Sequence, residues 1–345
     1  MRIVVAGIGV VTPLGDDYWE CVSKGMVKGY SVRGYENSRN RLLDITNNAM
    51  KKASLDAGLS SEELEATGVT ISSSKGNISQ VVQDLASGIK CEGPKLNVVS
   101  ACATGLNSII MGAGLIKTGR AKVVLAGGAD SCKTDFITSA FSKIGVLARD
   151  NVCRPYSRNR SGFVLSEGAC VVVLEEYEHA KKRNAKIYGE VSGWSSLSDA
   201  YHITSLDPLG TTIACAIEQC VDKAGVLLGE IDYINTHGTG TIGNDLVETT
   251  AIKKVFGKEA FKIPTSSTKA VTGHMLGASG AFEFVVGLLA MRESFIPPTA
   301  NYDEPDPLCD LDYTPNIGRK KELSNFITLS YGFGGHIAVV SGRKI

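Results

Sequence analysis

The sequence has no net charge and no long apolar run. Its 36 Lys and Arg residues balance 36 Asp and Glu residues, which excludes the bulk positive field of a nucleic-acid-binding protein. The most apolar helical stretch, Ala281–Met291, is interrupted by Glu283 and is too short to cross a bilayer. The N-terminal MRIVVAGIGVVTPLG is apolar but rich in glycine, with one basic residue, so we expect a first strand there rather than a signal peptide.

Cysteines are present, but their spacing lacks a pattern. The nine cysteines are an odd number and form no CxxC pair, which argues against a disulfide framework and against a zinc site. We therefore expect a reducing, cytoplasmic location and no bound metal.

Short β-branched runs alternate with helical patterns, which predicts an α/β fold. Strands are expected at 3–6, 95–100, 122–126, 168–174, 186–191, 231–235, 327–331 and 338–341. Helices are expected at 42–57, 102–117, 211–224, 245–256 and 277–291. The near-continuous apolar run 168–174 is typical of a parallel-sheet strand. The pattern restarts near residue 185 without a linker, which indicates two duplicated halves, residues 1–184 and 185–345.

The segment Val98–Leu106 (VVSACATGL) predicts a strand, a sharp turn and a helix with Cys102 at its first residue. A helix N-terminus stabilises an anion, so we expect a lowered pKa for the Cys102 thiol and a role as nucleophile. The alternative interpretation is a small buried cysteine in a tight turn.

A second candidate segment, NTHGTGT, places His237 at a strand end, followed by Thr239 and Thr241. Residues 238–243 also match GxGxxG, a dinucleotide-binding pattern that is weak alone. We discount it because the match begins directly after a histidine and because threonine hydroxyls stand where a pyrophosphate loop uses bare backbone. A glycine-rich turn with an incidental histidine remains the alternative.

A third segment leads into the apolar helix near residue 277. Lys269 lies five residues before His274, and Glu283 lies nine residues after it. A buried Glu must be paired, and Lys269 is the candidate partner. The small apolar neighbours argue against an ordinary surface lysine.

The fourth segment, YGFGGH, surrounds Phe333 between two strands. Backbone N–H groups in such a loop can stabilise an oxyanion, although a simple strand connection is the other interpretation. A thiol with two imidazoles, without metal-ligand spacing or a GxSxG motif, suits acyl transfer through a thioester.

At these residues the sequence resembles the elongating β-ketoacyl-acyl carrier protein synthases, which have the thiolase fold. The similarity extends from about Cys91 to the end, in addition to the N-terminal motif. The matching motifs occur in the family's order: VAGIGVVTPLG, SACATG, RPYSRNRSGFVLSEGACVVVLEE, HGTGT, SSTKAVTGHMLGASGAFE and GFGGH. The resemblance implies a layered αβαβα body built from two duplicated α/β halves.

The resemblance also implies roles for individual residues. Cys102 corresponds to the acyl-accepting nucleophile, and His237 and His274 to the histidines that stabilise the enolate formed by decarboxylation. Lys269 and Glu283 correspond to the pair that orients the histidines.

For the substrate pocket, the resemblance implies further roles. Phe333 corresponds to the gating residue whose backbone N–H joins that of Cys102 in the oxyanion hole. Thr239 and Thr241 correspond to residues that hold the phosphopantetheine arm, and Phe141 to an aromatic near the pocket. No cofactor is implied.

The implied reaction condenses an acyl group on Cys102 with malonyl-acyl carrier protein, in fatty-acid, polyene or polyketide elongation. The implied partners are an acyl carrier protein and a second ketosynthase-like subunit, in a homodimer or heterodimer. The sequence departs from the family pattern at two places before Cys102. Ser72–Gly93 replaces a longer segment of the family, and Gly34–Asn40 leads almost directly into a helix. This shortened N-terminal half bears on chain length and dimer geometry.

Two alternatives stay open. The chain could be a chain-length-determining partner subunit of a heterodimeric ketosynthase, although such partners usually lack the cysteine. It could also be a non-condensing thioester acyltransferase, although a thiolase would carry a second cysteine where Phe333 stands.

Overall fold

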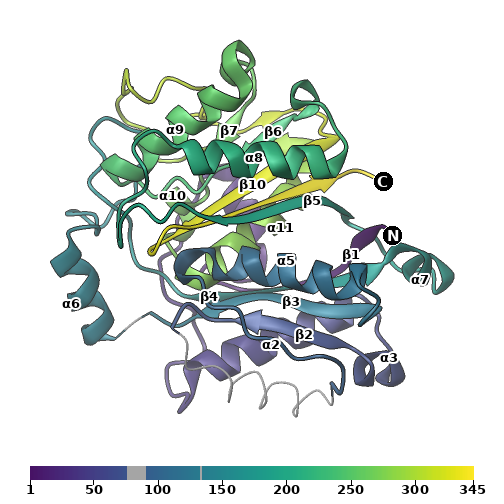
Figure 1. Cartoon of the computed structure of the whole chain (residues 1–345). Helices are drawn as coiled ribbons and strands as arrows, with labels where there is room; N and C mark the ends of the chain where they lie inside the picture. The colour runs from purple at the N-terminus through teal and green to yellow at the C-terminus, as the bar shows by residue number, and fades with distance from the viewer. Residues whose placement is uncertain (76–90, 133) are drawn as a thin grey trace.

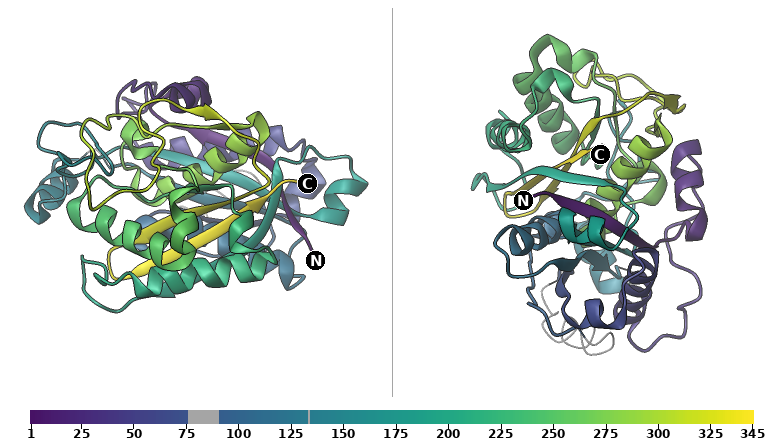
Figure 2. Two further views of the ribbon diagram at one scale, coloured as in Figure 1. Left: turned by 90° about the horizontal axis from the view of Figure 1, so that it is seen from above. Right: turned by 90° about the vertical axis from the view of Figure 1, so that its right-hand side faces the viewer.

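The structure is a computed structural model that describes residues 1–75, 91–132 and 134–345. Much of the shortened stretch Ser72–Gly93 lies outside the described residues. The described chain forms five alternating layers of helices and sheets, with the N-terminal half below and the C-terminal half above in Figure 1. Figure 2 shows the same body from two further directions.

The N-terminal half begins with a fully buried strand and places one helix at the centre of the molecule. Its elements are β1 (Ile3–Val11), α1 (Tyr18–Lys24), α2 (Arg41–Asp56), α3 (Ser61–Glu65), β2 (Gly68–Ser72), α5 (Thr104–Lys117), β3 (Val123–Asp130), α6 (Asp135–Ile144), β4 (Gly168–Glu176) and α7 (Tyr177–Lys182).

The C-terminal half repeats this plan. Its elements are β5 (Gly189–Ser198), α8 (Thr211–Ala224), β6 (Tyr233–Asn235), α9 (Ile242–Phe256), β7 (Thr265–Ser266), α10 (Lys269–Thr272), α11 (Ser279–Glu293), β8 (Phe295–Ile296), β9 (Arg319–Lys320), β10 (Asn325–Gly332) and β11 (His336–Arg343).

The strand order shows the duplication. Among the described residues, nine strands form one sheet in the order β2-β3-β4-β1-β5-β11-β10-β6-β7. In the N-terminal half, β4 pairs antiparallel with β1 and with β3. In the C-terminal half, β11 pairs antiparallel with β5 and with β10. β3 then pairs in parallel with β2, and β10 pairs in parallel with β6. The expected fold of two duplicated α/β halves is therefore what the chain adopts.

The central layer consists of α5 and α11, which lie between the two halves of the sheet (Figure 1). On α11 every residue from Ser279 to Met291 is buried, as a helix enclosed on all sides requires. Gly105 on α5 permits a close approach, since a Cβ there would lie 2.5 Å from the carbonyl oxygen of Gly277. This packing brings the start of α5 beside the segment that leads into α11.

Two expectations about elements were wrong. Segment 95–100 forms no strand, and only Lys95 makes an isolated bridge, to Val69. The apolar run in β4 pairs antiparallel with both neighbours, and its buried faces come instead from helices α2 and α11. Strand β2 and helix α6 were among the elements that were not expected; α6 carries an apolar stripe in its sequence, but none of its residues is buried.

The described residues contain no helix that is both long and apolar enough to cross a membrane.

Candidate active site

Cys102 lies in a strained turn directly before α5. It belongs to the 3-10 turn Ala101–Ala103, and the preceding Ala101 has a φ of +48°, which L residues rarely adopt. The Cys102 side chain is buried, at 8% exposure. Such strain persists where the surroundings enforce it, and it often accompanies a functional residue.

The protonation state of Cys102 differs from the expectation. Burial raises the pKa of the thiol to about 12, and the opposing charge of Lys269 does not offset this effect. The predicted lowering by the helix N-terminus was wrong for this reason, so the resting group is a neutral thiol.

The glycine loop after β10 packs directly on the Cys102 turn. A Cβ on Gly332 would lie 2.5 Å from the carbonyl oxygen of Ser100 and 3.1 Å from the Cys102 amide nitrogen. Positive φ angles at Gly334 and Gly335 then turn the chain into β11. Phe333, the residue after Gly332, is thereby placed beside Cys102.

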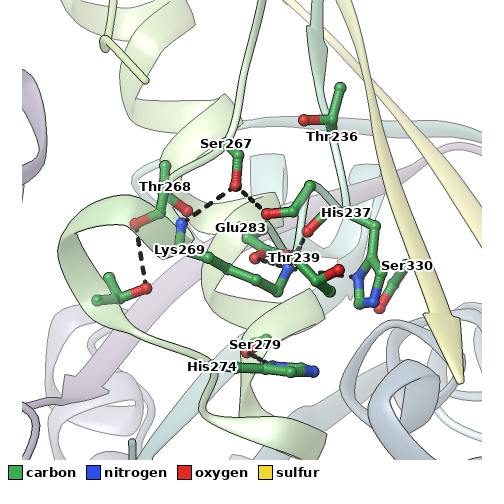
Figure 3. Close-up of polar contacts among 12 residues, drawn as sticks. Thr236, His237, Thr239, Ser267, Thr268, Lys269, His274, Ser279, Glu283 and Ser330 are labelled. Carbon is green, nitrogen blue, oxygen red and sulfur yellow. Dashed lines mark hydrogen bonds and ion pairs between the residues drawn. The ribbon is translucent and has the colours of Figure 1, made fainter. Parts of the chain in front are cut away.

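His237 follows β6 and is buried against Lys269. The Lys269 Nζ lies 3.3 Å from His237 Nδ1 and donates a hydrogen bond to its carbonyl oxygen at 2.5 Å (Figure 3). Burial, then the Lys269 charge, lower the pKa of His237 well below its ordinary value. A charged lysine only donates, so Nδ1 accepts and the imidazole proton sits on Nε2.

Lys269 and Glu283 form the expected pair. Both side chains are almost completely buried, and Lys269 Nζ donates to the Glu283 carboxylate. Burial raises the pKa of Glu283, while the Lys269 charge opposes that shift. The pair satisfies two charges that would be costly to bury separately.

His274 is held on the segment between α10 and α11. Its Nδ1 lies 3.0 Å from the Ser279 hydroxyl, which also accepts a hydrogen bond from the Met275 amide at 2.9 Å. Burial, then the Lys269 charge, lower the pKa of His274 well below its ordinary value. Its ring centre lies 5.5 Å from that of His237, so two neutral imidazoles stand side by side.

Two cavities meet at Cys102 and Phe333. The first, of about 590 Å³, is also lined by both histidines and by Thr239 and Thr241. The hydroxyls of these two threonines lie 2.8 Å apart. The second cavity, of about 470 Å³, lies against α6 and is lined in part by Phe141. The structure therefore brings every predicted site residue except the enclosed Lys269 and Glu283 onto these two cavities.

An aromatic cluster borders both cavities. Phe141 stacks on Phe333 with ring centres 6.3 Å apart, and it meets Phe163 edge-on at 5.9 Å. Phe163 in turn lies 4.8 Å from the His274 ring, again edge-on. Sequence reasoning did not assign Phe163 a place at the site.

Acidic residues that hold the site loops were also missed. On α9, Glu248 accepts hydrogen bonds from the amides of His237 and Gly238, both at 2.8 Å, and from the Tyr156 hydroxyl. Burial raises the pKa of Glu248 to about 7, against these hydrogen bonds. The signal that could have revealed it is the spacing of Asp245 and Glu248, three residues apart on the helix that follows the glycine loop.

A third missed carboxylate, Asp130, ends β3. It accepts hydrogen bonds from the amide of Gly277 at 2.7 Å and from the hydroxyl of Ser73 at 2.8 Å. It thereby fixes the loop after His274 to the N-terminal half. The described residues contain no group of three or more His, Cys, Asp or Glu side chains arranged to hold a metal ion.

The fold and this Cys-His-His site define a thiolase-like acyl-transfer protein. Family models for the beta-ketoacyl synthase N-terminal and C-terminal domains match residues 81–180 and 188–303. A 3-oxoacyl-[acyl-carrier-protein] synthase 2 from Coxiella burnetii is 35% identical over 97% of this chain and 96% of its own length. The chain therefore belongs to the β-ketoacyl synthase family, whose members are acyltransferases that form carbon–carbon bonds.

Other relatives and solved structures are similar over most of this chain. Nodulation protein E of Rhizobium meliloti (strain 1021) is 40% identical over 88% of this chain and 73% of its own length. Among solved structures, a type II PKS ketosynthase in complex with its acyl-carrier protein is 30% identical with a TM-score of 0.94, covering 100% of this chain and 99% of that chain. A ketosynthase/chain length factor structure is 28% identical with a TM-score of 0.93, with the same coverage.

Proposed function

We propose that this chain condenses an acyl group carried on Cys102 with malonyl-acyl carrier protein to give a β-ketoacyl-acyl carrier protein. The observation that carries the proposal is the meeting of two cavities at Cys102, one lined by both histidines and one lined mostly by apolar side chains. One cavity suits the carrier arm and the malonyl group, and the other suits the acyl chain.

In the first step the Cys102 sulfur attacks the thioester carbonyl of an acyl-carrier protein. The backbone N–H groups of Cys102 and Phe333 stabilise the tetrahedral oxyanion. The thiol proton ends on the departing phosphopantetheine sulfur, and the acyl group remains on Cys102. Starting from a neutral thiol, this transfer gives no net change of charge.

In the second step a malonyl thioester occupies the cavity that the histidines line. Loss of CO₂ leaves its electron pair on C2, and the enolate oxygen accepts hydrogen bonds from His237 and His274. For His237 the donor is Nε2, because Lys269 occupies Nδ1. The C2 carbon then attacks the acyl carbonyl, the C–S bond to Cys102 breaks, the β-ketoacyl thioester leaves, and the released Cys102 thiolate takes up one proton from solvent. Thr239 and Thr241 bind the phosphopantetheine arm.

We propose an acyl carrier protein and a second ketosynthase-like subunit as partners. The similarity to solved complexes with both kinds of partner supports this, and so does helix α6, where Phe136 is 83% exposed. The similarity to a chain length factor structure also keeps the chain-length subunit as an alternative. The complete set of Cys102, His237 and His274 favours the enzyme.

Two further assignments belong to the same proposal. The nine cysteines are thiols, which supports a reducing, cytoplasmic location. The repeat of strand order supports a division into residues 1–184, with the nucleophile, and residues 185–345, with the histidines and the lysine.

The test is product formation from an acyl-carrier protein and malonyl-carrier protein, followed by mass spectrometry. Wild type should form the β-ketoacyl product, and Cys102→Ala should lose it by more than about a thousandfold. Cys215→Ala, on α8 and outside the site, is the matched control and should keep activity. Full product formation by Cys102→Ala would overturn the proposal, and absence of product with wild type alone would favour the chain-length subunit.

A further inference from the structure

The cavity proposed for the acyl chain has a charged side chain in its wall. Its apolar lining includes Phe141 and Leu276, but Lys75 lines it too, with Ser74 beside it. The Lys75 side chain keeps 33% exposure. A saturated acyl chain gains nothing from an ammonium group in the wall of its pocket.

Lys75 is anchored at the edge of this cavity by three contacts. Its Nζ donates to Asp130 at 3.0 Å and to the carbonyl oxygen of Ser131 at 2.9 Å, and it lies 3.7 Å from the Cys132 sulfur. Burial lowers the pKa of Lys75, but the charges of Asp130 and Cys132 and the hydrogen bonds to them together outweigh burial, and the net shift is upward. The ammonium is therefore charged at neutral pH.

The contact with the Cys132 sulfur is the weakest of the three. A thiol sulfur is a weak acceptor, and 3.7 Å is long for a hydrogen bond. An oxygen atom in the cavity would be a better acceptor for that N–H group. The two strong contacts would meanwhile keep Nζ in place.

The charge of Asp130 decides which kind of oxygen fits. Asp130 is completely buried, and with Lys75 it forms a pair that is neutral overall. A carboxylate on the acyl chain would approach a second carboxylate, which is unfavourable in a poorly solvated site. A keto or hydroxyl oxygen gains the hydrogen bond without that repulsion.

We propose that Lys75 makes this chain selective for acyl groups that carry a keto or hydroxyl oxygen beyond the thioester carbonyl, rather than for saturated acyl chains. This inference rests on the proposed function, because it takes the second cavity as the site of the Cys102-bound acyl chain. It makes Lys75 a specificity-determining residue that acts through its Nζ.

The experiment measures the rate of acyl transfer to the full chain by intact-protein mass spectrometry. The donors are pantetheine thioesters of octanoate, of 3-, 5- and 7-oxooctanoate, and of octanedioate. Wild type should react with at least one oxo donor about tenfold faster than with octanoate, which is the effect of one hydrogen bond to a charged group. It should react slowly with octanedioate. Lys75→Met should remove that preference and raise the rate with octanoate.

Two further variants keep the test decisive. Lys75→Gln retains a donor toward Asp130 and should show a reduced preference, so it replaces Lys75→Met if that protein does not fold. Lys143→Met removes an exposed lysine of α6 that does not line the cavity, and it should keep the wild-type preference.

The outcomes separate this inference from the proposed function. Acylation with no oxo preference, a preference unchanged in both Lys75 variants, or a preference for octanedioate would overturn the inference alone. Absence of acylation with every donor would overturn the proposed function, and the inference with it.

Discussion

At the residue scale, one lysine acts together with burial on the protonation of both histidines. Lys269 pairs with Glu283, and its Nζ lies against His237 Nδ1. The lysine charge contributes to lowering the pKa values of both histidines, after burial. Both imidazoles therefore stay neutral near pH 7, with the Nε2 proton of His237 available for the enolate.

Replacing this pair should move the pH profile in a defined direction. In Lys269→Met/Glu283→Gln the repulsion that lowers the pKa of His237 is gone, so its pKa rises. The histidine then becomes protonated at higher pH, and the acid limb of kcat/KM should shift upward. The measurement is the pH dependence of condensation from pH 5 to 9. An acid limb at the wild-type position would contradict this role for Lys269.

The reacting side chains could be predicted from the sequence better than the carboxylates that hold their loops in place. Cys102, His237 and His274 stand in segments rich in glycine and other small residues, which leave room for substrate. Glu248 and Asp130 act on backbone amides of distant segments, and a single sequence does not show which amide a carboxylate will meet. The neutral Cys102 thiol was missed because burial is a property of the assembled core.

At the element scale, helices with a one-sided apolar face could be predicted closely. Helix α8 begins and ends at the predicted residues, Thr211 and Ala224. Segment 95–100 has the composition of a strand, but strand formation also needs partners along its length. Helix α6 exposes its apolar residues, so the usual link between an apolar stripe and a buried face does not apply to it.

Two glycines of α5 should respond oppositely to the same substitution. A Cβ on Gly105 would meet the backbone of Gly277 and Ala281 within 3.1 Å, whereas Gly114 has nothing within 4 Å. Gly105→Ala should lower the free energy of unfolding by about 1–3 kcal/mol through overpacking. Gly114→Ala should raise it by about 0.5–1 kcal/mol through helix propensity. Urea unfolding measures both, and equal effects of the two substitutions would refute the close approach of α5 and α11.

At the scale of the whole molecule, the duplication brings equivalent ends of two sheet halves to one site. Cys102 comes from the N-terminal half, and the histidines, Lys269 and Phe333 come from the C-terminal half. The restart of the strand pattern near residue 185 made the duplication predictable. The strand order, and the pairing of β1 with β5 that joins the halves, could not be predicted because they depend on contacts between distant segments.

Global stability should carry the signature of buried Glu248. Its pKa is about 7 in the folded chain and close to 4.5 when unfolded. A raised pKa means that the folded state holds the proton more tightly, so this contribution is complete below pH 4.5 and is lost as pH rises through 7. The loss amounts to about 3 kcal/mol.

The variant Glu248→Gln removes that titration. Between pH 4.5 and 7.5 its free energy of unfolding should fall less than that of wild type, by about 3 kcal/mol. Chemical unfolding at a series of pH values measures the difference. Parallel curves for wild type and variant would show that Glu248 does not titrate in this range.

Intact-protein mass spectrometry shows whether Cys102 carries the acyl group. Wild type and the Cys102→Ala variant are each mixed with acyl carrier proteins that carry short or medium-length acyl groups. We predict one acyl adduct on wild type, located at Cys102 by peptide mapping, and none on the variant. An adduct that persists in Cys102→Ala, or no adduct on wild type with any donor, would contradict the account.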